Sequence, residues 1–172
     1  QDRYTLADCA PAVRDLFARE LTHPGRTSAL AAAVGRDLAA RGYHAQVEPR
    51  DDSLALFHLA DGRHPMQLDG ARIVAGAVAR SPADWAAEAR VRPDTFSPNV
   101  LLRPVVQDTV FPTACYVAGP NELAYLAQLG GVYAHFQADE RHGGAGTHLA
   151  RRSRAGRLAA PLRKESRRKR DD

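Results

Sequence analysis

Four polar side chains are embedded in a stretch that is otherwise rich in valine, leucine and proline: Asn99, Arg103, Gln107 and Asp108. Polar groups buried without partners are costly, so these residues are expected to bind one another or a ligand. If a helix begins near Asn99, Arg103 and Gln107 follow at i+4 and i+8 and lie on the same side. An arginine beside two amides and a carboxylate is able to hold a ligand carboxylate or sugar hydroxyls. The alternative is an Arg103–Asp108 pair that only stabilises the turn.

A second group of candidate residues, Gly119, Asn121 and Glu122, lies at a sharp bend in the chain. The bend follows an apolar segment at 114–117, expected to be a strand, and precedes a helix expected over 121–129, ended by a glycine pair. This order is typical of parallel α/β sheets, in which ligands bind beyond the carboxyl ends of the strands. Backbone N–H groups at a helix start favour anions, although Glu122 opposes a negative charge there. An ordinary capping turn is the alternative.

Two amphipathic helices are expected ahead of these candidates. The first begins close to Pro11, which suits a first helical turn, and a turn at 23–26 ends it. Its apolar face carries four residues at helical spacing: Val13, Leu16, Phe17 and Leu21. Thr27 or Ser28 is expected to cap the second helix, which stops at Gly42. Its apolar residues are Leu30, Val34 and Leu38.

The hydrophobic period then changes to that of short strands. Strands are expected at 46–47, 54–59, 66–68 and 72–74. The dipeptides at 61–62 and 69–70 are both Asp-Gly, a hairpin-type turn signal. This portion is therefore expected to be a small antiparallel insert rather than a βαβ unit.

Two further helices are expected between this insert and the bend. Ser81 as N-cap, Pro82 at the first position and Asp84 at the third predict a helix that ends before Pro93. A short helix from about Arg103 is expected after a buried turn.

The positive charge is confined to the end of the chain. Residues 137–172 hold 11 Lys and Arg against 5 Asp and Glu, whereas the remainder holds 13 against 15. The body is therefore mildly acidic, and a basic surface over the whole protein is excluded. The last segment has little apolar periodicity, so it is expected to be a disordered basic tail. Such a tail is able to bind nucleic acid non-specifically, and a solvated tail without a partner is the blander alternative.

Cysteine and histidine usage excludes several kinds of site. Cys9 and Cys115 lie far apart and outside any C-x-x-C spacing, which indicates reduced thiols in a cytoplasmic protein. The seven histidines form no metal-binding motif, and His142 and His148 lie among glycines in the tail. No apolar run is long enough for a membrane span, and Gln1 opens a segment without a signal pattern.

The candidate residues belong to a longer motif series that resembles the BshC family, the cysteine-adding enzymes of bacillithiol biosynthesis. The series comprises the run 96–108 (FSPNVLLRPVVQD), Pro112-Thr113 and the run 116–125 (YVAGPNELAY). Upstream, the runs at 42–47 and 56–65 resemble the same family in the same order. The resemblance covers roughly Leu16 to Phe136.

This resemblance implies a cytoplasmic ligase that joins cysteine to glucosaminyl-malate. It also implies a homodimer and the involvement of a nucleotide, although no cofactor is visible in the sequence. The expected fold is α/β, part of a Rossmann-like core with an antiparallel connecting insert. The expected segments are a helical part of the core over 1–42, the insert over 43–80, the returning half of the core over 81–136 and the tail over 137–172.

Two departures from the family pattern lead to further expectations. Family members are much longer, and their Gly-Gln-Gln motif and an acidic, histidine-containing motif have no counterpart here. The chain is therefore expected to be a central fragment that lacks part of its pocket and is inactive or only partly competent as an enzyme. The resemblance also stops after Phe136, as it would if the tail were read in a shifted frame.

The sequence leaves two other functions open. One is a nucleic-acid-binding module that acts through Arg151 to Arg170, and the other is a folded remnant without function. In the ligase interpretation, Arg103 would hold a carboxylate such as that of the malyl group. Asp108 or Glu122 would receive the cysteine ammonium, and no residue is assigned as a general base.

Overall fold

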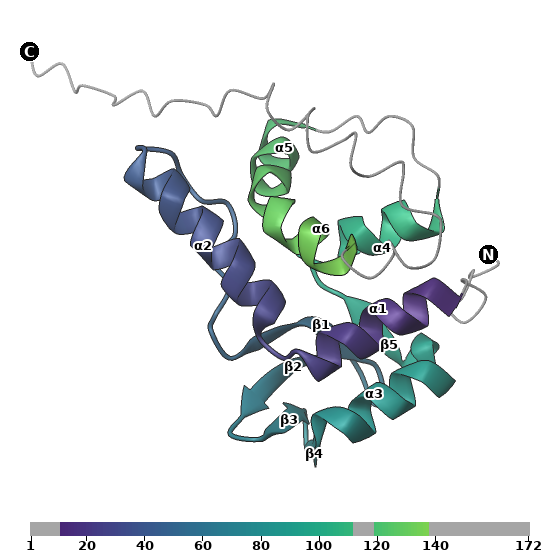
Figure 1. Ribbon diagram of the computed structural model, residues 1–172. Coiled ribbons are helices and arrows are strands. Elements are labelled where there is room, and N and C mark those ends of the chain that lie inside the picture. The colour runs from purple at the N-terminus through teal and green to yellow at the C-terminus, as the bar shows by residue number, and fades with distance from the viewer. Residues whose placement is uncertain (1–10, 112–118, 138–172) are drawn as a thin grey trace, which may run out of the picture.

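The computed structural model describes residues 11–111 and 119–137, and these form a mixed α/β structure (Figure 1). The helices are α1 (Pro11–Thr22), α2 (Arg26–Ala40), α3 (Pro82–Val91), α4 (Arg103–Val110), α5 (Pro120–Leu126) and α6 (Gly130–Gln137), with 3-10 turns η2 (Pro93–Thr95) and η3 (Ala127–Leu129). The strands are β1 (Ser53–His58), β2 (His64–Asp69), β3 (Arg72–Ala75), β4 (Val78–Arg80) and β5 (Phe96–Pro98). The predicted α/β class is confirmed. None of the described helices is long and apolar enough to cross a bilayer.

One antiparallel sheet holds all five described strands in the order β4-β3-β2-β1-β5. The first four strands follow one another as hairpins. The Asp-Gly turns predicted the first two of these hairpins, and Gly70 adopts a φ of +57° between β2 and β3. Strand β4 was not predicted. Strand β5 comes from farther along the chain and pairs with β1, where His58 lies opposite Phe96.

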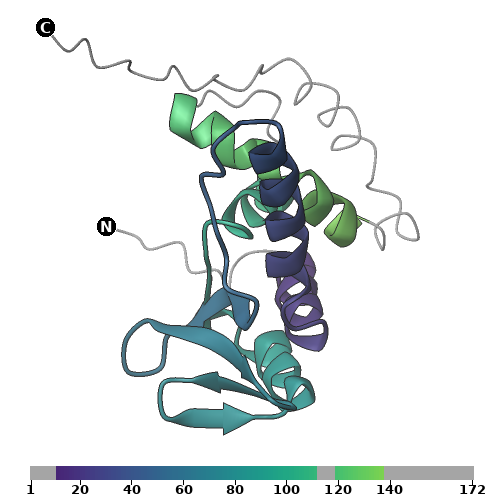
Figure 2. The same cartoon turned by 90° about the vertical axis from the view of Figure 1, so that its left-hand side faces the viewer.

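Helices α1 and α3 pack against each other beside the sheet (Figures 1 and 2). The predicted apolar face of α1 is buried, and Phe17 contacts Phe96 of β5 with ring centroids 6.3 Å apart. Trp85 of α3 is fully buried, and its indole N–H donates to the Ile73 carbonyl at 2.9 Å. Each large side chain of this kind contributes about 1.5–3 kcal/mol when it is fully buried. This core holds the sheet against the helices.

A buried carboxyl joins α1, α2 and β1. Glu20 is 0% exposed, and it accepts hydrogen bonds from the backbone N–H of Ala55 at 2.7 Å and from the Thr27 hydroxyl. Burial raises the pKa of Glu20, and the hydrogen bonds from Ala55 and Thr27 and the charge of His23 oppose this rise. Thr27 was expected to cap α2, but its hydroxyl binds Glu20 instead.

Helix α2 instead begins at Arg26, and its N-cap is Gly25, two residues before Thr27, where a φ of +78° makes the turn. Ser28 is also inside the helix, and its hydroxyl donates to the Ser53 carbonyl at 2.6 Å. The predicted cap was therefore wrong, since both hydroxyls bind partners elsewhere in the fold. Helix α2 buries its small residues Ala31 and Gly35 completely, while the predicted leucines and valine are only partly buried.

The predicted strand at 46–47 was wrong: these residues belong to an irregular connector that a side chain holds in place. The amide oxygen of Gln128 accepts the backbone N–H groups of Gln46 and Val47 at 2.9 and 3.0 Å. Its amide nitrogen donates to the Val47 carbonyl at 3.0 Å. A single fully buried glutamine thus replaces the neighbouring strand that a β-ladder would provide. Sequence periodicity could not distinguish these two arrangements.

The glycine pair at 130–131 does not end the helical region, as was predicted, but begins α6. Gly130 has helical dihedral angles, with φ of −54°. A Cβ at Gly131 would lie 3.5–3.6 Å from Leu30 of α2. This is an ordinary van der Waals distance, so the packing of α6 beside α2 does not require glycine at this position.

Candidate functional site

Helices α4, α5 and α6 lie together at the end of the molecule away from the sheet, where α6 packs against α2 (Figure 1). Helix α4 begins at Arg103, as predicted, with Pro104 in its first turn. Asn99 prepares this start, since its side-chain oxygen accepts the Leu101 N–H at 2.8 Å and its carbonyl accepts the Arg103 N–H at 2.9 Å. The backbone N–H of Asn99 donates to the Ala55 carbonyl of β1 at 2.9 Å. Asn99 therefore fixes α4 relative to the sheet.

The centre of the candidate site is the guanidinium of Arg103. It donates to Glu122 Oε1 at 3.0 Å and to the Tyr125 hydroxyl at 2.8 Å, both on α5. It also donates to Gln107 Oε1, one turn along α4, at 3.3 Å. The Tyr125 hydroxyl in turn donates to Glu122 Oε1 at 2.9 Å. We call these four residues the Arg103 cluster.

The Arg103 cluster is partly exposed, and its ion pair is weak enough for a ligand to compete with it. The side chains of Arg103 and Glu122 are 46% and 30% exposed. Burial and the hydrogen bond to Glu122 raise the pKa of Tyr125, while Arg103 opposes the rise, so Tyr125 stays a neutral donor at pH 7. Ion pairs this exposed contribute about 0–1 kcal/mol, so a ligand carboxylate is able to compete with Glu122 for the guanidinium.

The other predicted site residues lie around this cluster. Asp108 accepts a hydrogen bond from the Tyr133 hydroxyl of α6 at 3.0 Å, which fixes α6 to α4. Gly119 is the N-cap of α5, and its carbonyl accepts the Leu123 N–H at 2.9 Å. Gly119 and Asn121 are both exposed at the start of that helix. The structure thus brings together Arg103, Gln107 and Glu122, and places the remaining candidates at the edges.

Sequence reasoning missed Tyr125 and Tyr133 as members of this region. A usable signal existed for Tyr125, because it follows Glu122 at i+3 and therefore lies on the same face of α5. No comparable signal points to Tyr133, since its partner Asp108 lies 25 positions away in the sequence.

A second polar cluster surrounds Glu88 on α3. Glu88 Oε1 lies 3.2 Å from His58 Nε2, and Arg80 and Arg92 pair with the same carboxylate. Burial opposes ionisation of Glu88, but the hydrogen bond and charge of His58, the charge of Arg80 and the hydrogen bond of Arg92 together lower its pKa. The His58 ring packs edge-on against Trp85, with centroids 4.8 Å apart. This cluster joins the sheet to α3.

Two hollows also open at the surface. One, of about 460 Å³, lies between α2 and the connector at 42–49 and is lined by Gly35, Tyr43 and Val47 among others. The second lies at the turn between α1 and α2. No group of three or more His, Cys, Asp or Glu side chains suited to a metal ion occurs within residues 11–111 and 119–137.

Several predictions concern residues outside the described part of the chain. They are the strand at 114–117, the two cysteines Cys9 and Cys115, the histidines His142 and His148, and the basic tail with Arg151 to Arg170. These stay predictions. The first residue of the expected tail, Gln137, is described and is the last residue of α6.

Known proteins resemble the chain over most of its described part. Residues 10–140 match the family model described as "Bacillithiol biosynthesis BshC, N-terminal Rossmann-like domain". A protein of Salinibacter ruber named "Putative cysteine ligase BshC" is 44% identical over 124 residues, which is 70% of this chain and 22% of the relative. Proteins of the same name from Koribacter versatilis and Chloroherpeton thalassium are 36% and 37% identical, over 69% and 72% of this chain and 22% of each relative.

The chain thus spans about a fifth of the length of these relatives. The match includes the Arg103 cluster and every predicted site residue, and it confirms the resemblance inferred from the motif series and the Rossmann-like class. The chain belongs to the BshC family, within its N-terminal Rossmann-like domain.

Proposed function

We propose that the Arg103 cluster binds glucosaminyl-malate in a cysteine ligase reaction of bacillithiol biosynthesis. Membership of the BshC family supports the reaction class. The observation that carries the choice of site is the half-exposed guanidinium of Arg103, which α4 presents to the carboxylate and phenol of α5. Because the chain spans about a fifth of its named relatives, the proposal concerns its contribution to such an enzyme.

The cluster has complementary groups for both substrates. The Arg103 guanidinium suits a malyl carboxylate, because arginine forms bidentate, charge-assisted hydrogen bonds with carboxylates. Glu122, or Asp108 at the edge of the site, would accept the ammonium of cysteine. Asn99, Gln107, Gly119 and Asn121 would line or support the pocket.

The ligation forms an amide bond with net loss of water, so it needs an energy donor. A nucleotide is proposed for this role because the family resemblance implies one. Assembly as a homodimer and a cytoplasmic location are likewise proposed from the family alone.

The first experiment measures binding of glucosaminyl-malate to the full chain by isothermal titration calorimetry, with wild type and the Arg103→Gln variant. Glutamine keeps a polar side chain that donates hydrogen bonds, but it is shorter and removes the charge. We expect the affinity to fall by about tenfold or more, since hydrogen bonds to charged groups contribute about 1.5–3 kcal/mol. Glucosamine, which lacks the malyl carboxylates, should bind both proteins equally.

The matched control is Arg90→Gln, which removes the same charge from an exposed position on α3. We expect this variant to bind glucosaminyl-malate as the wild type does. Equal affinity of Arg103→Gln and wild type, with both proteins folded by circular dichroism, would contradict the assignment of the site. An equal loss of affinity in both variants would show a general charge effect and contradict it as well.

A further inference from the structure

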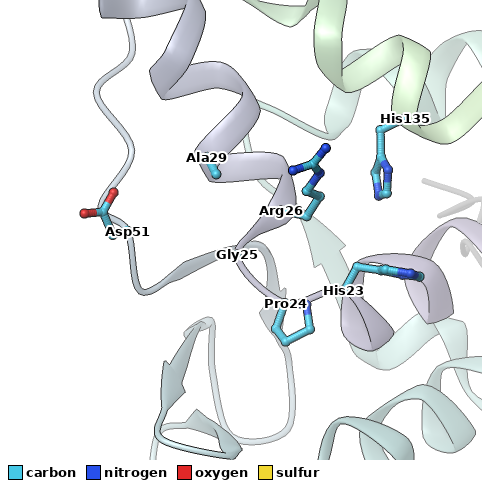
Figure 3. A pocket seen from close by; sticks show the side chains of 7 residues that line it. All are labelled: His23, Pro24, Gly25, Arg26, Ala29, Asp51 and His135. Atoms are coloured by element: carbon cyan, nitrogen blue, oxygen red, sulfur yellow. The ribbon is translucent and has the colours of Figure 1, made fainter.

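A hollow opens where the α1–α2 turn meets α6, and none of its lining residues belongs to the Arg103 cluster. The hollow there has a volume of about 370 Å³. Basic side chains from three different elements line it: His23 after α1, Arg26 at the start of α2 and His135 on α6 (Figure 3). The opposite wall is formed by Gly25 and Asp51. We call this the α1–α2 hollow.

Two of these basic groups have unused hydrogen-bonding capacity. His135 Nε2 is buried and has no hydrogen-bond partner within the described part of the protein. Leaving a buried polar atom without a hydrogen-bond partner is energetically unfavourable. The Arg26 side chain is exposed, and it forms no hydrogen bond or ion pair with any residue of 11–111 or 119–137. By contrast, His23 Nδ1 is already engaged by the Arg19 carbonyl at 3.1 Å.

The electrostatic surroundings favour a negative charge in this hollow. Burial first, and then the charges of Arg19, His23 and Arg26, lower the pKa of His135. Of the nearby acids, Glu20 is fully buried and already accepts two hydrogen bonds. Asp51 lies on the other side of Gly25 from Arg26 and His135 (Figure 3). Among the described residues, no acid is one of the charges that act on His135, although Asp51 also lines the hollow.

We propose that the α1–α2 hollow binds a phosphate group, through Arg26 and His135 and with the ring of His23 at its edge. A phosphate presents acceptor oxygens in several directions, which suits donors that converge from three elements. A carboxylate has a planar fork that suits one arginine. The first turn of α2 also lines the hollow, so the positive end of its helix dipole adds to the attraction. This inference does not rest on the proposed ligase function.

The test is a titration of the full chain with inorganic phosphate. Calorimetry measures the binding, and NMR of the histidine ring protons measures the pKa of His135. We expect saturable binding and an upward shift of the pKa of His135, because an anion that binds the protonated ring stabilises it. Acetate at the same ionic strength should bind much more weakly. A second arm uses glycerol phosphate: tighter binding than inorganic phosphate assigns the site to phosphorylated metabolites, and weaker binding assigns it to the free ion.

Arg26→Gln and His135→Gln should each reduce the phosphate affinity by about tenfold or more, the scale of one hydrogen bond to a charged group. The matched control Arg36→Gln removes the same charge from an exposed position farther along α2, and its affinity should equal that of the wild type. Circular dichroism checks that the two glutamine variants are folded. If only one of them folds, the phosphate affinity of that variant is enough to test the proposal. Non-saturable binding, equal binding of acetate, or an equal loss in Arg36→Gln would overturn the proposal.

Discussion

Replacing Gln128 by methionine tests whether one side chain holds the connector between α2 and β1. Methionine has a similar length and keeps the apolar packing, but it removes both the amide acceptor and the amide donor. The wild-type amide makes three hydrogen bonds, to Gln46 N–H, Val47 N–H and the Val47 carbonyl. Because Gln128 is 0% exposed, water cannot reach the position of its amide and replace these hydrogen bonds.

The expected loss follows from the number and type of these bonds. Neutral hydrogen bonds contribute about 0.5–1.5 kcal/mol each, so the three together predict a loss of about 1.5–4.5 kcal/mol in the free energy of unfolding. The lower half of this range is favoured, because Gln46 and Val47 are at least partly exposed and their backbone groups are able to turn to water.

Urea denaturation followed by circular dichroism measures this free energy. The matched control is Gln46→Met, which changes the same residue type at an exposed side chain and leaves the backbone N–H in place. We expect that control to stay within about 0.5 kcal/mol of the wild type, as is usual for surface substitutions. A loss in Gln128→Met no larger than that of the control would refute the idea that the amide holds the connector.

Two further predictions concern α1 and α3. Glu20 has a raised pKa, so the native state binds its proton more tightly than the unfolded chain and stability falls as pH rises from about 4.5 through the native pKa. The Glu20→Gln variant should not show this decrease, so its free energy of unfolding relative to wild type, measured in urea titrations, should increase with pH. A difference that stays constant with pH would contradict the raised pKa of Glu20. Ser81 caps α3 by accepting the Asp84 N–H at 3.2 Å, so Ser81→Ala should lower the free energy of unfolding by about 0.5–2 kcal/mol. The control is Ala83→Gly at an exposed position of the same helix, which should lower the urea midpoint. If Ala83→Gly lowers the midpoint and Ser81→Ala leaves it unchanged, the cap does not contribute to stability.

Local signals predicted the parts of the fold that depend on neighbouring residues. Pro11 and Ser81-Pro82 mark the starts of α1 and α3, and the Asp-Gly turns lie between strands or beside them. The expected caps of α2 failed because Thr27 and Ser28 have better partners in distant elements. A hydroxyl at a helix start has the same sequence signature whether it caps the helix or binds a buried carboxyl.

The candidate site was predictable in a similar way. Spacing along α4 placed Gln107 on the same side as Arg103, and the structure confirms their contact. The contact of Arg103 with Glu122 depends on how α5 folds back against α4, and spacing along the sequence could not indicate it. Whether these residues bind substrate stays a prediction.

The route of the chain through the sheet has a kinetic consequence. Strands β1 to β4 pair with neighbours in sequence, whereas β5 reaches β1 only after α3 has crossed from one edge of the sheet to the other. Closing a longer loop costs more entropy, so we expect the hairpins to form early and β5 to dock late in folding. Asn99 follows β5 directly and fixes the start of α4, so we expect the Arg103 cluster to acquire its geometry only when this last strand has docked.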